Sequence, residues 1–584
     1  MSETTPGREA IQIVEIQQPI CSRVFGSSPC LATGTGDTKC YNTRATCQYV
    51  SAFDLATPLS LYFSKGKVAD QGIAPYVIPS LVSVSTSPTR INLAGSNPDA
   101  QGLGNRALCT ISFMDHVHTD RLVDPYLSGR SWDPLDGSRG SFWSRWAVRN
   151  KYRQNIVIKV YEGYAGQTLA EMTSRTYFMQ SLQGPDSAGR VTIQGKDVLT
   201  RIEERKAQAP VASNGVLYTD LNSTDTSFEV AGALVSEYAT SGTLRINDEI
   251  VTYTAVATST NGIEFAGVTR GTDNTTAEEH SVDDTVQQCL RYVETDIDDV
   301  VAELLGDYGG IPSEYLDTAS WASEVDDYLT LTKINGLVTE PTSVFELMSE
   351  LQEQCLFYVW WDERDAKVKL KAVRGIDVEP QTYTDESHII SGSFSLTEKP
   401  RERASQAWVY FNQTDYTASK TSPQAYAAVS IVANLESETE NLYGEPSIRK
   451  VFARFLATSA LATNTASKIV SRYVDVPAQC TFRMDAKDRA VWVGDNIYIS
   501  HYLDVDAFGA RRIRQWTITS AEEKVPGEVV EYTAEDTTLY GRINYIMASG
   551  AANYPGYDSA PFKNCYIGDA DGLLSDGADS GKIS

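Results

Sequence analysis

The length of this chain excludes a single hydrophobic core, and this constrains its fold more than any short motif does. With 584 residues and about 150 residues per domain, we expect roughly four folding units. The apolar fraction of 42% is ordinary for a globular protein, and 31 tyrosines indicate many β-strands. Changes in hydrophobic periodicity along the sequence therefore indicate where the units begin and end.

Two long regions have the pattern of strands and turns. The first covers about 50–205 and contains the short apolar run IVIKVY at 156–161. The second covers 390–540, with one helix expected near 461–473. Residues 541–584 are rich in Gly, Ala and Asp without periodicity, so we expect an extended arm or a disordered tail there.

An acidic block separates these regions. Residues 211–289 contain twelve Asp or Glu, two Arg and no Lys. Short alternating segments with turns at spacings of about 8–12 residues predict a small all-β module over 210–290. Because the block is so acidic, we expect the module to be an inserted, peripheral unit that faces solvent.

Residues 291–380 change to an α+β pattern. Apolar residues predict one helix over 297–305, which ends at a run of glycines. Ser343 and Glu346 have the spacing of a capping box and predict the start of a second helix. A hairpin is expected around the turn at 362–365, because alternating apolar residues follow it.

The charge and the hydropathy pattern exclude some classes of protein. A net charge of −26 and a pI near 4.7 argue against a nucleic-acid binder, because phosphates would be repelled. Simple solubility also explains such a charge. There is no run of 18 apolar residues and no signal-like start, so we expect neither a membrane span nor secretion. Assembly in a reducing cytosol would disfavour disulfides.

Four of the nine cysteines lie within 27 residues, at Cys21, Cys30, Cys40 and Cys47. Their spacing lacks the C-x2-C pairs of zinc ribbons. Four thiolates without a neighbouring histidine fit an iron–sulfur cluster or a zinc site, while two disulfides or ordinary buried thiols are the alternatives. The segment is rich in Gly, Ser and Thr and carries little core, so a bound metal would order it.

The other candidate residues favour structural roles. The remaining five cysteines are scattered and are expected in cores: Cys109, Cys289, Cys355, Cys480 and Cys565. His116 and His118 would share one face of a strand, but no third ligand is apparent, and we expect a surface strand there. The Trp- and Arg-rich stretch at 132–153 is typical of packing or of a subunit contact.

No catalytic motif is present in the sequence. It contains neither H-E-x-x-H nor G-x-S-x-G, and residues 34–39 lack the spacing of a phosphate-binding loop. Carboxylates are abundant, but no pair is distinguished as a glycosidase pair. We therefore expect no enzymatic activity and assign no catalytic residues.

The order of the blocks resembles the tail hub proteins (baseplate hub or tail-tip proteins) of long-tailed bacteriophages and gene transfer agents. The resemblance spans roughly 150–535. It is carried by RQNIVIKVYEGYAG at 153–166, GTLRINDEIVTYT at 242–254, VFELMSELQEQCLFYVWWDERDAKVKLKAV at 344–373 and IVSRYVDVPAQCTFRMDAKDRAVWVGDNIYI at 469–499.

This resemblance implies a multidomain, mainly β fold with α+β parts. It implies two tail-tube-like β-barrel hub domains, which we expect over 51–209 and 381–540, with an α+β hub domain over 291–380 between them. The small all-β module is then an insertion, and residues 1–50 are an N-terminal Cys-rich metal-cluster segment. Three subunits would supply six barrels and so match a trimeric tip to a hexameric tube.

The resemblance also implies a cofactor and a role. Some tail-tip relatives bind a [4Fe–4S] cluster through four cysteines, which here would be Cys21, Cys30, Cys40 and Cys47, with zinc as the alternative. The expected protein is a structural virion component, assembled in the host cytoplasm, that acts as a homotrimeric hub at the tail tip or baseplate.

Such a hub would join the tail tube or a distal tail protein to a central fibre or receptor-binding tip proteins. It would line the ejection channel, through which DNA passes without specific binding. The alternatives are a tail-associated cell-wall hydrolase, a redox enzyme that uses the cluster, and a carbohydrate-binding adhesin.

Overall fold

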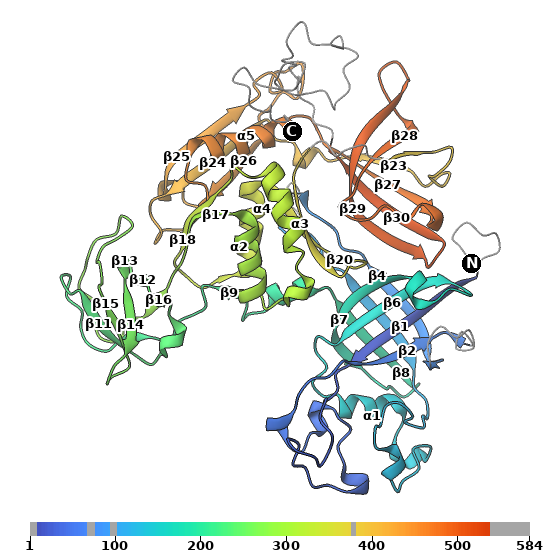
Figure 1. Ribbon diagram of the computed structural model, residues 1–584. Coiled ribbons are helices and arrows are strands. Elements are labelled where there is room, and N and C mark those ends of the chain that lie inside the picture. Colours follow the sequence, from blue (N-terminus) through green and yellow to red (C-terminus); the bar gives the residue numbers. More distant parts are fainter. Residues whose placement is uncertain (1–8, 67–75, 94–101, 375–380, 538–584) are drawn as a thin grey trace, which may run out of the picture.

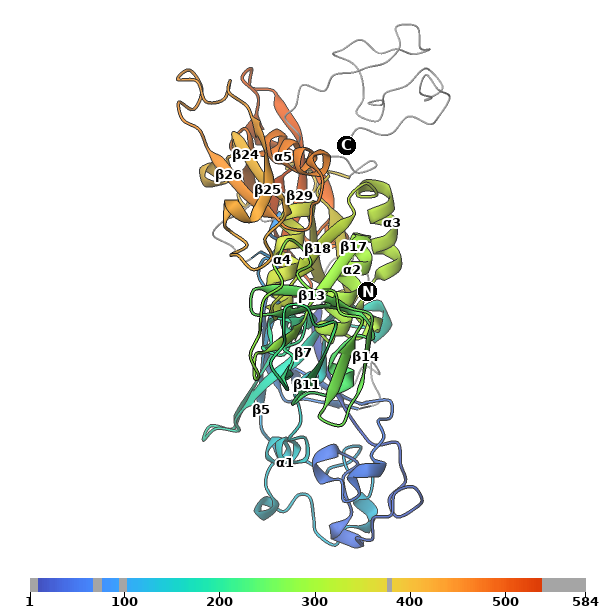
Figure 2. The ribbon, with the colours of Figure 1, turned by 90° about the vertical axis from the view of Figure 1, so that its left-hand side faces the viewer.

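The computed structural model describes residues 9–66, 76–93, 102–374 and 381–537, and it is mainly β with few helices (Figure 1). Several sheets are arranged around a central group of helices. In the side view, the segment around α1 lies at one end of the molecule and the strands β24–β26 lie at the other (Figure 2). No helix among these residues is long and apolar enough to cross a membrane.

The first large sheet has eight strands, in the order β3-β2-β1-β6-β7-β8-β5-β4. Strand β8 alternates between buried and more exposed residues, and its Val191 and Ile193 point into the core. The strands are β1 (Ala10–Gln18), β2 (Leu59–Ser64), β3 (Val77–Ile78), β4 (Leu81–Ser87), β5 (Leu108–Met114), β6 (Val157–Tyr164), β7 (Thr173–Gln183) and β8 (Arg190–Lys196). Helix α1 (Phe142–Arg149) packs against this core through Trp143 and Trp146.

The two edges of this sheet meet at a short turn. The edge strands β3 and β4 are separated only by residues 79 and 80, but no ladder of hydrogen bonds joins them in the described part of the chain. The closed barrel that the resemblance implies over 51–209 is therefore not seen among these residues. Strand β1 lies in the middle of the sheet, so the cysteines follow a core strand of this sheet.

The acidic block folds into a small all-β unit with its own core. Two sheets form it, in the orders β10-β11-β15-β14 and β13-β12-β16. The strands are β10 (Val216–Leu217), β11 (Ser227–Ala231), β12 (Gly242–Ile246), β13 (Glu249–Tyr253), β14 (Ala255–Thr258), β15 (Ile263–Ala266) and β16 (Val286–Gln288). The chain enters and leaves at neighbouring points, because the Gln287 side chain bonds to the backbone of both Val211 and Ser213.

A central α+β part packs helices against short strands and forms the largest core. The predicted helix over 297–305 is α2 (Ile297–Glu303), continued by a π-helical turn at Leu304–Tyr308. The other elements are β9 (Gln208–Ala209), β17 (Leu290–Thr295), α3 (Thr318–Tyr328), β18 (Ile334–Val338), β19 (Thr342–Ser343), α4 (Val344–Cys355), β20 (Phe357–Asp362) and β21 (Lys367–Ala372). Strands β20 and β21 confirm the predicted hairpin.

The capping box predicted at the start of α4 is wrong. Ser343 is the N-cap residue, but its side chain makes no capping hydrogen bond. The carboxylate of Glu346 instead pairs with the ammonium group of Lys420 from a distant loop. A tertiary ion pair therefore replaces the local capping bond.

Residues 381–537 contribute to two cores rather than to one. A six-stranded sheet has the order β22-β28-β29-β30-β27-β23. Its strands are β22 (Thr382–Thr384), β23 (Ser395–Glu398), β27 (Ala478–Asp485), β28 (Asn496–Val505), β29 (Arg511–Val525) and β30 (Val529–Asp536). No closed barrel is seen among the described residues here either, because β22 and β23 stay at the edges of the sheet.

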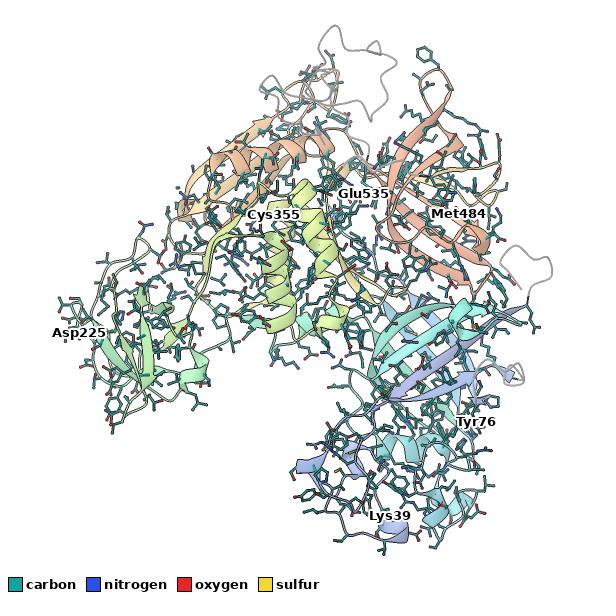
Figure 3. The ribbon with its side chains drawn as sticks, in the orientation of Figure 1. Lys39, Tyr76, Asp225, Cys355, Met484 and Glu535 are labelled. Carbon is teal, nitrogen blue, oxygen red and sulfur yellow. The ribbon has the colours of Figure 1, made fainter. Side chains whose placement is uncertain are left out.

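The segment between β23 and β27 forms a separate three-stranded sheet, β25-β24-β26, which joins the central core. Its strands are β24 (Gln406–Gln413), β25 (Tyr426–Ala433) and β26 (Ile448–Ala453), and α5 (Ser459–Tyr473) confirms the predicted helix near 461–473. Figure 3 marks these regions by Cys355 on α4, Met484 on β27 and Asp225 in the acidic module. The expected tail at 541–584 lies outside the described residues.

The two large sheets are joined directly. Arg90 forms a backbone bridge with Ser520 on β29, and the neighbouring Ile91 and Leu93 are buried in the core of the six-stranded sheet. Tyr164 at the end of β6 donates its hydroxyl to the carbonyl of Gly527, 2.5 Å away. Strand β29 and the turn that follows it are thus fixed to the first sheet.

Candidate functional site

The four clustered cysteines lie in one irregular segment, residues 19–58, which connects β1 to β2 and is called the cysteine loop below. Apart from isolated bridges, its only regular structure consists of three short 3₁₀ turns. It is held against residues 115–150, which include α1. Lys39 marks the loop at the end of the molecule in Figure 3.

The structure brings the four thiols together around one small space. Cys21, Cys30, Cys40 and Cys47 all line a cavity of about 20 Å³, together with Phe25 and other loop residues. Burial raises the pKa of the Cys40 thiol, and the nearby Cys47, Cys30 and Cys21 contribute to the same rise. A set of four soft donors at one place has the chemistry of a zinc or iron–sulfur site.

The side chains are nevertheless not arranged as a formed metal centre. In the part of the chain that the structure describes, no group of three or more His, Cys, Asp or Glu side chains is placed to hold a metal ion. All eight cysteines in the described ranges are free thiols, so the disulfide alternative is not seen among them. Cys109, Cys289, Cys355 and Cys480 are buried as expected, and Cys565 lies outside the described residues.

A single arginine fixes the backbone of the cysteine loop. Arg130 Nη1 donates hydrogen bonds to the carbonyl oxygens of Gly36, Asp37 and Lys39, and Nη2 donates to that of Cys40. These distances lie between 2.9 and 3.1 Å. The guanidinium group is held in place by an ion pair from its Nε to Asp124, 2.9 Å away, and both side chains are fully buried. The planar guanidinium group suits this role because its N–H donors point in different directions within one plane.

A buried aromatic and ionic layer lies under the loop. The ring of Tyr41 lies between the guanidinium groups of Arg130 and Arg149, at 4.1 and 3.9 Å from its centroid. Arg149 and Arg145 both pair with the buried carboxylate of Asp120, at 2.8 and 3.1 Å. The Trp- and Arg-rich stretch therefore serves packing, one of the two roles expected for it.

The two neighbouring histidines belong to this packing layer. His116 stacks on Phe142, and His118 contacts the same ring edge-on. Burial lowers the pKa of His118 to about 4, and the neighbouring His116 adds to the effect. The expected surface strand is absent, because residues 115–120 form no strand and His118 is buried.

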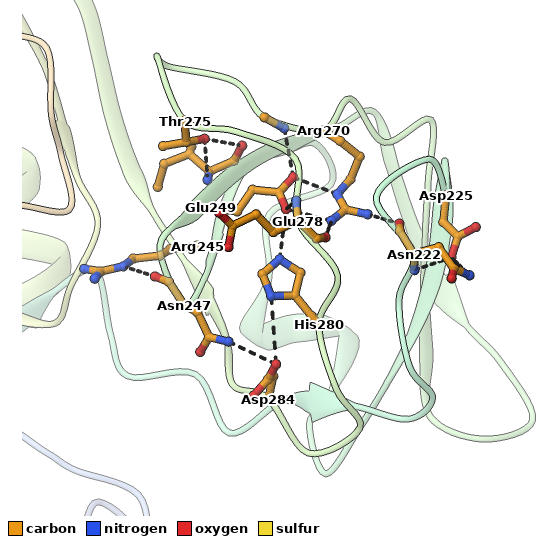
Figure 4. Close-up of polar contacts among 12 residues, drawn as sticks. Asn222, Asp225, Arg245, Asn247, Glu249, Arg270, Thr275, Glu278, His280 and Asp284 are labelled. Carbon is orange, nitrogen blue, oxygen red and sulfur yellow. Dashed lines mark hydrogen bonds and ion pairs between the residues drawn. The ribbon is translucent and has the colours of Figure 1, made fainter.

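The acidic module contains a buried polar cluster that the sequence did not reveal (Figure 4). The carboxylate of Glu249 accepts from Arg270, at 2.6 and 2.7 Å, from the backbone N–H of Gly271 and Glu278, and from His280. Burial alone would raise the pKa of Glu249, but the bonds from Arg270, Glu278 and His280 lower it to about 2. This cluster fixes the long loop between β15 and β16 and leaves the carboxylate fully engaged.

Comparison with known proteins gives no family assignment. No protein-family model matches the chain, and no curated protein matches it. It is similar to the solved structure of a tail protein from Neisseria meningitidis MC58, with 9% identity and a TM-score of 0.32 over 65% of this chain and 88% of the other. A 43 kDa tail protein of prophage MuSo2 from Shewanella oneidensis has 9% identity and a TM-score of 0.35 over 78% and 93%.

A prophage tail protein from Listeria monocytogenes EGD-e has 9% identity and a TM-score of 0.28 over 65% of this chain and 84% of the other. All three structures are described as tail proteins, and two of them come from prophages. At such TM-scores the likeness carries no conclusion about how this chain works.

Proposed function

We propose that this chain is a structural tail protein, the hub that joins a tail tube to the distal tip of a phage-like particle. The observation that carries the proposal is that two large, mainly antiparallel sheets of one chain are joined directly. The backbone bridge between Arg90 and Ser520 joins them. The sequence resemblance over roughly 150–535 supports the same role. Three such chains in a ring would supply six β domains and so match a three-fold tip to a six-fold tube.

The negative charge of the chain suits the wall of a channel through which DNA passes. A net charge of −26 disfavours adhesion of phosphates to the channel wall. We propose that the partners are the tube or distal tail protein on one side and fibre or receptor-binding tip proteins on the other. The protein would perform no turnover, and a cell-wall zymogram is expected to stay blank.

The oligomeric state tests this proposal. We expect the purified full-length chain to form trimers in light-scattering measurements, alone or after its tube protein is added. Electron micrographs of intact particles should place the chain on the tail axis. A monomer that stays a monomer with the tube protein, or a peripheral position in the particle, would refute the hub assignment.

We also propose that the cysteine loop holds a metal centre, with an iron–sulfur cluster as the expected group and zinc as the alternative. The convergence of four thiols on one cavity supports this. The cavity of about 20 Å³ suits one ion better than four irons and four sulfides, so a cluster would require the loop to open around it. Its role would be structural, because metal–thiolate bonds would fix a loop that has little core.

Metal analysis of freshly prepared protein tests the metal centre. Anaerobic purification should give a brown protein with broad visible absorption if a cluster is present, or a colourless protein with about one zinc per chain. Replacing Cys30 with Ser should remove the metal and impair tail assembly. Replacing the buried Cys355 with Ser is the matched control and should leave the metal content unchanged. A metal-free wild-type protein would exclude both forms of the site.

A further inference from the structure

The three-stranded sheet β25-β24-β26 has one face that helix α5 covers and an opposite face that α5 does not reach. The hydroxyl oxygens of Ser430 on β25 and Thr463 on α5 are 2.8 Å apart, so Ser430 lies on the covered face. Its partner across the ladder, Val409, is fully buried there. Because side chains alternate along a strand, the residues before and after these two lie on the opposite face, which we call the outer face.

The outer face is aromatic and apolar. The strand register sets its side chains in rows across the sheet, and we define it by Trp408, Tyr410, Val429, Ile431, Ile448 and Phe452. The rings of Tyr410 and Phe452 stack with their centroids 4.9 Å apart. Ile431 is 52% exposed, and Val429 and Ile448 are exposed as well. An exposed apolar surface of this kind is typical of a contact with another protein.

The outer face ends at an unprotected strand edge. Strand β25 pairs with β24 on one side, and no other strand in the described ranges pairs with it. Its sequence, YAAVSIVA, contains no charged residue and no proline. Proteins usually protect a long edge strand with such residues, because an edge without them pairs with other chains. The edge and the outer face together therefore have the features of a subunit contact.

A second exposed apolar surface lies on the hairpin that connects β28 to β29. Phe508, in the turn of this hairpin, is 96% exposed, and the other large apolar side chains near it are exposed too. We call this surface the hairpin tip and define it by Tyr502, Leu503, Val505, Phe508, Arg512 and Ile513. An aromatic side chain that projects so far into solvent is well suited to anchor a contact with another protein.

The two surfaces lie on opposite sides of the same end of the molecule. Figure 1 shows strands β24–β26 at the upper left and the hairpin of β28 and β29 at the upper right. The two surfaces are therefore separated within one chain. Different contact surfaces on opposite sides of a subunit produce head-to-tail assembly, which closes into a ring when the rotation between subunits allows it.

The charges at the two surfaces are complementary. On the hairpin, Arg511 and Arg514 pair with carboxylates, while the exposed Arg512 forms no ion pair with a described residue. Beside the outer face, the loop at 434–447 connects β25 to β26 and contains four Glu but no Lys or Arg. The only charged residue in the rows of the outer face itself is Lys450, whose ammonium group lies 5.5 Å from the centroid of the Trp408 ring. The acidic loop therefore favours a partner that carries a free cation next to apolar side chains.

We propose that the hairpin tip of one subunit binds the outer face of the next copy of this chain. Phe508 and Ile513 would then pack on the aromatic and apolar rows, and Arg512 would face the acidic loop. Three such contacts close a ring. The inference rests on the proposed hub function and supplies the subunit contact that a trimeric hub requires.

Sedimentation of full-length variants tests this contact, with the tube protein present if wild type needs it to form trimers. Phe508→Glu and Ile431→Glu each place a charge in the apolar contact, and each should weaken trimer formation by about a hundredfold or more. Leu331→Glu is the matched control, because Leu331 is 84% exposed and belongs to neither surface. It should form trimers as wild type does. Thermal unfolding should be unchanged in all three variants, because the replaced side chains are exposed.

Mixing the two variants tests whether the surfaces bind each other. The Ile431→Glu chain keeps an intact hairpin tip, and the Phe508→Glu chain keeps an intact outer face. One contact can therefore form between the two chains, but a ring cannot close. We expect one-to-one heterodimers that appear only in the mixture.

The possible failures distinguish this contact from the hub function. Trimers of both folded variants, or a mixture without heterodimers, would overturn the contact and leave the hub proposal standing. Intact trimers that no longer bind the tube protein would assign the outer face to the tube protein and also overturn the contact. A wild-type chain that stays monomeric with its tube protein would overturn both proposals.

Discussion

At the scale of residues, the cysteine loop depends on polar contacts rather than on a core. Arg130 binds four backbone carbonyls of the loop and one carboxylate, while Tyr41 is held between two guanidinium groups. All buried polar groups of this cluster have hydrogen-bond partners only while the cluster is complete, because the loss of any one side chain leaves its buried partners without a bond. Hydrogen bonds, an ion pair and aromatic contacts therefore hold the segment that carries the thiols.

Replacing Arg130 with Lys should loosen the cysteine loop. The ammonium group of the new lysine keeps a positive charge near Asp124, but it cannot donate to four carbonyl oxygens as the guanidinium group does. We expect the free energy of unfolding to fall by about 2–3 kcal/mol, and cleavage within 19–58 by a protease to become faster. Arg121→Lys, at an exposed position, is the control for limited proteolysis and should behave as wild type. Equal cleavage of both variants would show that Arg130 does not hold the loop.

At the scale of elements, the sequence predicts periodic segments well, but it does not predict contacts between segments that lie far apart in the chain. The helices α2 and α5, the hairpin β20–β21 and the separate acidic module follow from spacing and turns that lie within each segment. The failed capping box depends on Lys420, more than 70 residues from Glu346. The role of Arg130 was missed for the same reason, because the carbonyl groups that it binds come from a distant segment.

The candidate site was predicted only in part. The clustering of cysteines in the sequence indicated that they share a place, and the cavity that they line agrees with this. Their spacing does not determine how the thiols point, because the loop between them has no periodic pattern. The Glu249 cluster likewise could not be predicted, since Arg270 and His280 reach Glu249 through the fold of the module.

Replacing Glu249 with Gln should destabilise the acidic module in a way that depends on pH. The low pKa of Glu249, about 2, means that the folded module favours the carboxylate. Its contribution is present above the unfolded value near 4.5 and is lost as the pH falls through about 2. We expect a loss of about 3 kcal/mol at neutral pH, seen as faster hydrogen exchange in β13, and a shrinking difference from wild type in acid. Glu264→Gln, which is exposed on β15, should change exchange little at any pH.

At the scale of the whole molecule, the two large sheets meet at a polar junction. A cavity of about 180 Å³ lies there. It is lined by Arg90 from the connection between β4 and β5, by Glu402 shortly before β24 and by Glu535 on β30. Lys399 faces the same space. Burial raises the pKa of Glu402 to about 7, and the carboxylate of Glu535 adds to the rise. The junction that carries the hub proposal thus contains a carboxyl group that resists ionisation.

Replacing Glu402 with Gln should stabilise the chain in mild alkali. Folding raises the pKa of Glu402 from 4.5 to about 7. The protonated carboxyl group therefore contributes its full stability below pH 4.5, and this contribution is lost as the pH rises through about 7. The amide cannot ionise, so at about pH 8 the free energy of unfolding should exceed that of wild type by about 2 kcal/mol, with little difference at about pH 5. Denaturant titrations measure both values, with exposed Glu398→Gln as control. A constant difference across this range would assign the effect to packing instead.

The neighbouring entry and exit of the acidic module have an evolutionary consequence. Because Gln287 contacts both Val211 and Ser213, the two ends of the insert nearly coincide, and the surrounding scaffold does not need to stretch to hold it. An insert whose ends nearly coincide can be replaced by another of different shape without a change in the surrounding scaffold. Lineages that share this scaffold should therefore differ most in what they display at this one position.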